Sequence, residues 1–471
     1  MSGDDPRALV ARVLARVTTR IDGGRLVADA ATTDPVFATA TDVLAVGKAA
    51  LSMLRGLPAA LEPGRSVLAV APPSLPPSLP GPVLPAVSVA VAGIDLVTAD
   101  HPRPTTRSVA AAAAALAFVR AVGGRRDRIA PAGAGRGDAS SRAPAQLLVL
   151  LSGGASSLLC APAGAIAWTD KRDAIEAVAR AGATIRELNV VRKHLSAIKG
   201  GQLALVTRAP IVARALSDVI GDDPATIGSG PFTADPSTFA EALAIVDRLG
   251  APVPAVVRAH LRRGTRGERP ETPKPGDAAL DHVAYQVLAG PARVIAEARL
   301  AVAVEGLERP PGALPINSED TVDALAAAIL ARARPTAGVD TAPRVFIGNG
   351  EPRVVLPAAD EAATAHRAGR GGRATHLALA VARGLGLLPE AIRARAVFLA
   401  SGTDDRDGDT DVSGAIVDGT TWHRARALGL DPEQALRRFD SLSVLAATGD
   451  TIRGPGTSNL LDLHLLVGPF R

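Results

Sequence analysis

The sequence predicts an α/β protein with parallel sheets and two domains. Short runs of Val, Leu and Ile recur without polar alternation, and each run ends at glycine or at a polar cluster. Unbroken apolar runs are typical of strands covered on both faces. Alanine-rich stretches lie between them, so strand, loop and helix alternate as in a parallel sheet. With 471 residues and 47% hydrophobic content, the chain can bury at least two cores.

The expected strands, in chain order, are residues 43–46, 147–151, 211–216, 345–347 and 397–400. The clearest expected helix covers residues 108–122, with Ser108 as its cap. In an open parallel sheet, ligands bind beyond the carboxyl ends of the strands. The Gly-, Ser- and Asp-containing loops that follow these runs are therefore the first places to look for a site.

Two segments interrupt the alternation. Residues 123–145 lack periodicity and predict a mobile surface insertion. Residues 262–277 contain three prolines and predict a linker. We therefore expect an N-terminal domain over residues 1–265 and a C-terminal domain over residues 278–471.

Composition argues against several classes of protein. The formal net charge is only +5, aromatics are 2% of residues, and no basic block is present, so we expect no nucleic-acid partner.

Cys160 is the single cysteine, which rules out an intrachain disulfide and fits a reducing compartment. No apolar run approaches the roughly 20 residues that span a bilayer, and the first residues lack the apolar core of a signal peptide. We expect a soluble cytoplasmic protein without a membrane partner.

Lysine is rare in this chain. Five of the 52 cationic residues are lysines, at positions 48, 171, 193, 199 and 274. An ammonium is a compact point charge that can follow a moving phosphate or carboxylate, whereas guanidinium is a planar fork. Lys48 comes directly after Gly47 at the end of the first expected strand. Scarcity favours a functional role for Lys48 over a solvated surface lysine.

A glycine-rich loop follows the expected strand 147–151. Glycines let a backbone approach an anion, and free N–H groups at a helix start favour negative charge. We interpret the loop as a phosphate cradle, and a plain tight turn between strand and helix is the alternative. The candidate phosphate ligands are Ser152, Gly153, Gly154, Ser156 and Ser157.

Positive charge is dense in residues 187–201. Arg192, Lys193, His194 and Lys199 lie within about two helical turns, a density that attracts a small acidic ligand. Lys193 and His194 are the candidate ligands of an acidic substrate. A solvated helix face, or a structural histidine at position 194, would give the same pattern.

Carboxylates follow the expected strand 211–216. Asp218 and Asp222 lie where Mg²⁺ binding or acceptance of a hydroxyl proton would suit them. Alternatively, Asp223-Pro224 opens a turn.

Residues 401–411 contain five aspartates within eight positions. An EF-hand is excluded, because Thr410 stands where its sharp-turn glycine should be and Ile416 replaces its bidentate carboxylate. Magnesium binding through Asp404 and Asp407 and a self-capping Asx loop both remain open.

Several common motifs are missing from the sequence. It has no Walker P-loop, no G-x-G-x-x-G after a strand, no G-x-S-x-G elbow, and no Cys/His set with metal-ligand spacing. These absences argue against P-loop enzymes, nicotinamide enzymes of the Rossmann type, and α/β-hydrolases.

In their order along the chain, the motifs resemble the class II glycerate 2-kinases, whose C-terminal half is known as the MOFRL domain. The resemblance covers nearly the full length. It is carried by Val46-Gly47-Lys48-Ala49-Ala50, Asp100-His101-Pro102, Ser152-Gly153-Gly154-Ala155-Ser156, residues 187–201, 216–222 and 228–231, Gly371-Gly372-Arg373, and the Gly402-Thr403-Asp404 loop.

The resemblance implies transfer of a phosphoryl group from ATP, with Mg²⁺, to the C2 hydroxyl of D-glycerate, giving 2-phosphoglycerate. It implies a Rossmann-like N-terminal parallel-sheet sandwich, a smaller α/β MOFRL domain, and an active site in the interdomain cleft. The essential lysine and arginine of the family match Lys48 and Arg373. Asp218 would orient the glycerate hydroxyl, or hold Mg²⁺ through Asp222. The small-molecule partner would be D-glycerate, and a homodimer is compatible with this expectation.

The C-terminal half departs from the pattern of the family. Ala374-Thr375-His376 replaces the Asn and Gln-Glu that usually follow Gly-Gly-Arg, and Asp405 and Asp409 replace a Gly and a Pro. These changes leave strict specificity for D-glycerate open. Two alternative functions therefore stand beside the kinase: an NAD(P)H-dependent hydroxypyruvate reductase, and a nucleotide- or small-acid-binding protein with impaired catalysis.

Overall fold

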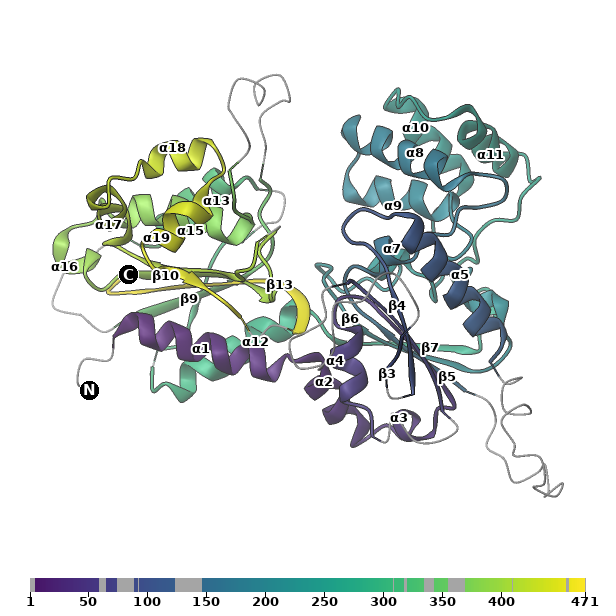
Figure 1. Ribbon diagram of the computed structural model, residues 1–471, viewed down its shortest axis with the longest axis horizontal. Helices are drawn as coiled ribbons and strands as arrows, with labels where there is room; N and C mark the ends of the chain where they lie inside the picture. The colour runs from purple at the N-terminus through teal and green to yellow at the C-terminus, as the bar shows by residue number, and fades with distance from the viewer. Residues whose placement is uncertain are drawn as a thin grey trace. The chain divides into compact units, whose positions relative to one another are not determined.

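The structure is a computed structural model that describes residues 5–58, 65–73, 89–91, 93–122, 146–307, 309–316, 320–333, 343–354, 369–408, 410–454 and 457–470. It divides into two compact units (Figure 1). The first unit is Gly23–Leu288, and the second unit combines Met1–Asp22 with Ala289–Arg471. The expected insertion at residues 123–145 lies outside the described residues.

The first unit contains a seven-stranded sheet in the order β3-β4-β2-β1-β5-β6-β7. Strands β4, β2, β1, β5 and β6 are parallel neighbours, and β3 is antiparallel to β4. Every residue of β1 and β5 is buried, which confirms that these unalternating runs are covered on both faces. The strands are β1 (Asp42–Val46), β2 (Ser66–Ala71), β3 (Val89–Val91), β4 (Ile94–Thr98), β5 (Leu147–Leu151), β6 (Ile211–Leu216) and β7 (Val283–Ala289).

Helices lie on both faces of this sheet (Figure 1). Helices α8, α9, α10 and α11 also pack on one another around a separate apolar core. The helices are α2 (Gly23–Ala31), α3 (Val36–Thr39), α4 (Ala50–Arg55), α5 (Thr106–Arg120), α7 (Ala155–Leu158), α8 (Trp168–Arg180), α9 (Ile185–His194), α10 (Phe239–Arg248) and α11 (Ala255–Thr265), with 3-10 turns η2 (Ala204–Val206), η3 (Ile227–Ser229) and η4 (Ala278–Leu280).

Helix α5 begins earlier than expected. Its cap is Thr105, whose hydroxyl accepts a hydrogen bond from the Arg107 N–H, and Ser108 completes a capping box instead of starting the helix. The prediction of Ser108 as the cap was therefore wrong by three residues. Ala111, Ala112 and Ala115 of this helix are fully buried, and such small side chains let a helix pack closely on a sheet with few aromatic residues.

The second unit contains a six-stranded sheet in the order β12-β11-β10-β13-β9-β8. The expectation of a parallel sheet was wrong for this unit. Strands β12, β11, β10, β13 and β9 are antiparallel neighbours, and only β8 runs parallel to β9. The strands are β8 (Gly312–Ala313), β9 (Arg344–Asn349), β10 (Val397–Asp404), β11 (Gly414–Asp418), β12 (Thr451–Ile452) and β13 (Thr457–Gly468).

Helices cover both faces of the second sheet (Figure 1). Helices α1 and α12 pack together on one face, and α13, α15 and their neighbours cover the other around a second apolar core. The helices are α1 (Pro6–Arg20), α12 (Pro291–Val304), α13 (Val322–Leu330), α15 (Arg373–Leu385), α16 (Glu390–Arg393), α17 (Thr421–Ala427), α18 (Pro432–Arg437) and α19 (Ser441–Ala447).

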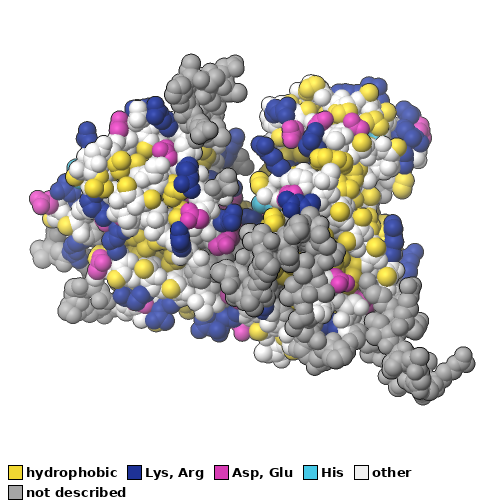
Figure 2. All heavy atoms as spheres, in the orientation of Figure 1, with side chains coloured by type: hydrophobic (Ala, Val, Ile, Leu, Met, Phe, Trp, Pro, Cys, Tyr) yellow, Lys and Arg dark blue, Asp and Glu magenta, His cyan; other side chains and the backbone are white. Residues whose placement is uncertain are grey.

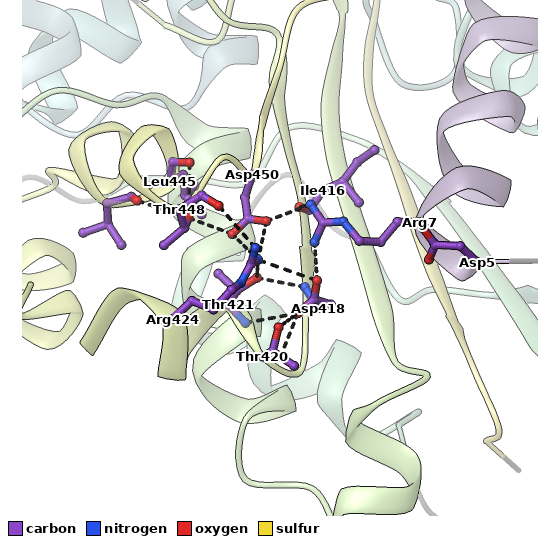
Figure 3. A network of polar contacts seen from close by, with 11 residues as sticks. Asp5, Arg7, Ile416, Asp418, Thr420, Thr421, Arg424, Leu445, Thr448 and Asp450 are labelled. Atoms are coloured by element: carbon purple, nitrogen blue, oxygen red, sulfur yellow. Dashed lines mark hydrogen bonds and ion pairs between the residues drawn. The ribbon is translucent and has the colours of Figure 1, made fainter. Parts of the chain in front are cut away.

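Helix α1 belongs to the second unit although it begins the chain. Its Arg7 forms ion pairs with Asp418 and with Asp450, the latter at 2.7 Å between Nη2 and Oδ1 (Figure 3). Arg7 also donates to the Ile416 carbonyl at 2.8 Å. Arg424 approaches the same buried Asp450 carboxylate at 2.6 Å. The expected N-terminal domain over residues 1–265 therefore loses its first helix to the other unit.

The expected linker at residues 262–277 is part of the first unit. Helix α11 continues through Thr265, and Thr272 is buried with its hydroxyl donating to Asp235 Oδ2 at 3.0 Å. Proline spacing alone suggested a flexible connection, but the side chains between the prolines are held by helix α10 and the segment before it. The first unit accordingly extends to Leu288.

Figure 2 shows charged side chains on one face of the molecule. On the face shown in Figure 2, Lys and Arg lie among Asp and Glu and do not gather into one patch. Within the described ranges, no helix is both long enough and apolar enough to cross a membrane.

Candidate functional site

The carboxyl ends of three adjacent parallel strands bring the main candidate loops to one edge of the first sheet. Val46 of β1 pairs with Leu151 of β5, and Leu151 pairs with Ala215 of β6. The loops that begin at Gly47, Ser152 and Ser217 therefore leave the sheet side by side. This edge is where open parallel sheets bind ligands.

The loops after β1 and β5 are joined by hydrogen bonds. The Lys48 N–H donates to the Gly153 carbonyl at 2.9 Å, and the Ala49 N–H donates to Ser152 Oγ at 3.1 Å. Gly47 has a φ of 131°, and a Cβ on it would lie 2.1 Å from Ser152 Oγ. Only glycine permits this approach.

Ser152 is fully buried, and its hydroxyl donates to the Val46 carbonyl at 3.4 Å. The sequence suggested that this hydroxyl contacts phosphate. Its observed contacts join the two loops and support Lys48 and Gly153, and a contact of Ser152 with phosphate stays a prediction.

Gly154 begins helix α7 in a left-handed conformation, with a φ of 87°. A Cβ there would lie 2.9 Å from His101 Cδ2 and 3.4 Å from Lys48 Cγ. The backbone of the glycine turn is therefore flanked by a lysine stem and an imidazole. Half-buried Ser157 completes the turn, its hydroxyl donating to the Gly154 carbonyl at 3.3 Å. A narrow, glycine-lined turn beside a cation fits phosphate groups.

A second polar cluster begins at Ser156. Lys199 Nζ lies 2.7 Å from Ser156 Oγ and 2.8 Å from the Ser156 carbonyl oxygen. Ser156 Oγ lies 2.9 Å from Ser229 Oγ. Lys199 and Ser229 are buried, whereas Ser156 is half-buried. The cluster therefore belongs to the same loop as the glycine turn.

Two glycine-containing segments hold this cluster in place. The Gly200 N–H donates to the Ser229 carbonyl at 3.0 Å, and the Gly201 N–H donates to the Gly230 carbonyl at 2.7 Å. Ser229 has a φ of 63° between two glycines that also have positive φ. A left-handed serine is disfavoured, and such residues persist where the surrounding structure requires them, often at functional sites.

Asn189 and Arg192 of helix α9 extend the cluster. Ser229 Oγ lies 3.4 Å from Asn189 Oδ1, and Arg192 Nη1 donates to the same oxygen at 3.2 Å. Burial lowers the pKa of Arg192. Arg192 makes no ion pair with any residue that the structure describes. Sequence reasoning noticed the density of charge here but did not assign Lys199, Ser229 or Asn189 to the site.

The side chains of Lys193 and His194 are bonded to groups other than the hydroxyls of Ser156 and Ser229. Lys193 Nζ pairs with the buried Asp235 carboxylate at 3.1 Å. His194 Nδ1 lies 2.8 Å from the Val190 carbonyl and its Nε2 lies 3.3 Å from Glu271 Oε2, with the ring against Phe239. Both side chains have partners inside the helical layer, and binding of the substrate by Lys193 and His194 stays a prediction.

The acidic loop after β6 contains two half-buried carboxylates, Asp218 and Asp222. Asp222 has a φ of 53°, and its Oδ1 is buried without a hydrogen-bond partner. An orphaned carboxylate oxygen fits a hard cation such as Mg²⁺. Asp223 makes the expected turn, accepting from the Ala225 N–H at 3.1 Å and the Thr226 hydroxyl at 2.6 Å.

In the second unit, Arg373 is the first residue of helix α15 and forms an ion pair with Glu351. Asp407 caps the same helix, accepting from the Ala374 N–H at 2.9 Å and the Thr375 N–H at 2.7 Å. Burial raises the pKa of Asp407 although these hydrogen bonds oppose the rise. These contacts support the Asx-cap alternative, and metal binding by Asp407 stays a prediction.

Asp404 ends strand β10 and is half-buried. Within the described ranges, no group of three or more His, Cys, Asp or Glu side chains is arranged to hold a metal ion. Asp404 and Asp222 therefore remain single candidate ligands.

The residues that depart from the expected Gly-Gly-Arg continuation are built into helix α15. Thr375 Oγ1 accepts from the Gly372 N–H at 2.9 Å. The His376 ring stacks on Phe439 with 4.9 Å between centroids, and burial lowers the pKa of His376. These substitutions therefore pack the start of the helix that carries Arg373.

Comparison with known proteins supports the family resemblance that these motifs carry. A family model described as a domain of unknown function (DUF4147) matches residues 4–262, and the MOFRL family model matches residues 344–462. A glycerate kinase of Danio rerio is 33% identical, covering 69% of this chain and 71% of that protein. The chain belongs to the class II glycerate kinase family. It is therefore an enzyme of the phosphotransferase class.

Other members of the family extend this comparison. A D-glycerate 2-kinase of Thermotoga maritima is 33% identical over 67% of this chain and 71% of that protein. A crystal structure of glycerate kinase from the same organism has a TM-score of 0.74 at 26% identity, covering 98% of this chain and 99% of that one. A protein of Agrobacterium vitis with the provisional name hydroxypyruvate reductase is 36% identical, over 80% of this chain and 78% of its own length.

Proposed function

We propose that the protein transfers the γ-phosphoryl group of ATP, with Mg²⁺, to the C2 hydroxyl of D-glycerate and forms 2-phosphoglycerate. The observation that carries this proposal is the joined pair of loops after β1 and β5. Their hydrogen bonds set Lys48 beside the glycine turn at Gly153 and Gly154, in a chain of the glycerate kinase family.

The glycine turn would hold the nucleotide phosphates. Backbone groups of Gly153 and Gly154 are the proposed cradle, with the Ser157 hydroxyl at its rim. Ser156 also lies in this loop, but it contacts Lys199 and Ser229. Mg²⁺, when bound, would neutralise charge on the β- and γ-phosphates. The unpartnered Asp222 Oδ1 is the proposed protein ligand for it, with Asp218 nearby in sequence and Asp404 as a candidate from the second unit.

Lys48 and Arg373 are proposed to act on the transferred group itself. Phosphoryl transfer needs aligned oxygens and positive charge around three spreading negative oxygens more than it needs covalent work by the protein. Lys48 supplies a mobile point charge from the first unit. Arg373 supplies a planar guanidinium from the second unit. To bind the phosphoryl group, Arg373 would break its ion pair with Glu351.

D-glycerate is the proposed acceptor of the phosphoryl group. In this scheme Asp218 orients the hydroxyl or supports Mg²⁺ beside Asp222.

Incubation of the purified protein with ATP, Mg²⁺ and D-glycerate tests the proposal. We expect ADP and, by ³¹P NMR, the phosphomonoester of 2-phosphoglycerate. 3-Phosphoglycerate as the product would contradict the C2 assignment. Oxidation of NADH with hydroxypyruvate, without ADP formation, would support a reductase, and neither reaction would indicate a binding protein.

A further inference from the structure

We propose that Ser156, Ser229, Asn189, Arg192 and Lys199 form the subsite for the acceptor acid, in which Arg192 holds the carboxylate and Ser156 passes the hydroxyl proton to Lys199. This inference rests on the proposed function, because it assigns the acceptor side of that reaction. We call these five residues the acceptor cluster.

The first support is the contrast between two neighbouring buried lysines. Lys193 is neutralised by the Asp235 carboxylate, 3.1 Å away. Lys199 is also buried, but among the residues that the structure describes its Nζ contacts neutral oxygens only, namely Ser156 Oγ, Ser229 Oγ and two carbonyls. A buried ammonium without a carboxylate is unfavourable. The neutral amine, which can accept a proton, fits this position.

Most of the charged groups around Lys199 lower its pKa, as its burial does. Burial lowers its pKa well below the usual lysine value, and Lys171 of α8 and Arg192 and Lys193 of α9 lower it further. The Cys160 thiol after α7 is the one main group that opposes the shift. Asp235, in the segment before α10, is paired with Lys193 at 3.1 Å.

The second support is a hydrogen-bonded path that ends at the Arg192 guanidinium, which pairs with no carboxylate of the described residues. It runs from Lys199 through Ser156, Ser229 and Asn189 to Arg192. An α-hydroxy acid has a carboxylate one bond from the hydroxyl-bearing carbon. Arg192 at one end and the serine hydroxyls at the other match those two groups in charge and in hydrogen bonding.

Exposure indicates which side chain of the relay meets the substrate. Ser156 is half-buried and can meet a ligand, whereas Lys199 is buried behind it. The substrate O2–H proton passes to Ser156 Oγ as the Ser156 hydroxyl proton passes to Lys199 Nζ. The O2–P bond forms, the bond from Pγ to the β–γ bridging oxygen breaks, and the electron pair leaves on ADP. Lys199 then holds the proton as an ammonium until it is released to water. In this scheme Asp218 does not take the hydroxyl proton and supports Mg²⁺ beside Asp222.

The small number of lysines makes a direct test practical. Protein labelled with ¹³C at lysine Cε should give five resonances, and Lys199→Met and Lys199→Arg each identify the resonance that disappears. We expect that resonance to titrate well below an ordinary lysine and to shift when D-glycerate is added without nucleotide. An ordinary titration, or no response to D-glycerate, would overturn the proposal whether or not the protein is a kinase.

Kinetics give an independent readout. Lys199→Met and Ser156→Ala should lower kcat by about 10²-fold or more and abolish the rise of kcat with pH through the Lys199 titration. Arg192→Gln should raise KM for D-glycerate at least tenfold and leave KM for ATP unchanged. Lys274→Met, a lysine outside the cluster, serves as the control. A normal pH profile in both Lys199→Met and Ser156→Ala would contradict the relay.

Discussion

Lys171 and Lys199 show how burial changes the chemistry of a single side chain. Lys171 Nζ donates to the Ala161 carbonyl at 3.1 Å and makes no ion pair with the residues described. Burial lowers the pKa of Lys171 to about 8, and Arg192 adds to the shift while Cys160 opposes it. The folded chain therefore holds this proton less tightly than the unfolded chain does.

Lys171 should make stability depend on pH in the alkaline range. Because its folded pKa is lower than its unfolded pKa, the unfolded state binds more protons between the two values, and stability rises as pH increases from about 8 to 10.5. The shift corresponds to something on the order of 3 kcal/mol. Urea unfolding at pH 7.5 and pH 10 should show the wild type gaining stability relative to Lys171→Met. A difference that is constant with pH would contradict this account.

Rare lysines were a useful signal in the sequence, but their partners could not be read from it. Lys193 and Lys199 are six positions apart, and the sequence alone does not distinguish their surroundings. Asp235 neutralises Lys193, and Ser229 faces Lys199, and both partners are more than 29 residues further along the chain. The same limit explains Ser152, whose hydroxyl joins strand ends that are distant in sequence. Motif composition predicted the loops, and tertiary contacts decide which atoms in them are free to bind.

At the scale of the element, helix α15 depends on a cap from a distant loop. Gly372 precedes the helix, and a Cβ on it would lie 2.2 Å from Asp407 Oδ1. This close approach lets both Asp407 oxygens reach the first N–H groups of the helix. Arg373 is thereby fixed at the helix start.

Replacing Asp407 should weaken this helix start. Asp407→Ala removes two acceptors and should cost about 1–2 kcal/mol of unfolding free energy, with a loss of activity because Arg373 is no longer fixed. Asp407→Asn keeps one acceptor and should cost less. Thermal unfolding and a Mg²⁺ titration of activity check both variants. An increased Mg²⁺ requirement with unchanged unfolding would instead make Asp407 a metal ligand.

The sequence predicted some strands of both sheets, namely β1, β5 and β6 of the first and β9 and β10 of the second, but it predicted the strand direction correctly only for the first sheet. Short apolar runs ending at polar loops correspond to β1, β5 and β6, because parallel strands buried on both faces require continuous apolar residues. Strand β13 was missed, since Asp462 and His464 interrupt its apolar run. His464 is nevertheless fully buried and bonds to the Gly350 carbonyl at 2.9 Å. Inserting β13 between β10 and β9 makes the second sheet antiparallel, and no local pattern encodes that pairing.

At the scale of the whole molecule, the chain's first helix completes the unit formed by Ala289–Arg471. Arg7 stands between Asp418 and Asp450, and Arg424 shares the Asp450 carboxylate (Figure 3). The Asp450 side chain is fully inaccessible to solvent. Residues more than 400 positions apart therefore share one electrostatic network.

Arg7→Ala should destabilise the second unit. We expect a loss of about 1–3 kcal/mol, because a buried carboxylate loses one cation but keeps Arg424. Hydrogen exchange should increase in strand β11 and helix α19 and stay unchanged in strand β5. Arg20→Ala, at the exposed end of α1, is the matched control. Equal exchange changes in β5 and β11 would contradict the assignment of α1 to the second unit.

The central claim is that Lys48 and Arg373 act together on one transferred phosphoryl group. The most direct measurement is the rate of ADP formation with D-glycerate by Lys48→Ala and Arg373→Ala, with Lys274→Ala and Arg370→Ala as controls for lost charge. We predict that each of the first two loses about 10³-fold or more in kcat without a change in thermal unfolding, and that the controls keep their activity. Parental rates in both Lys48→Ala and Arg373→Ala would contradict the claim.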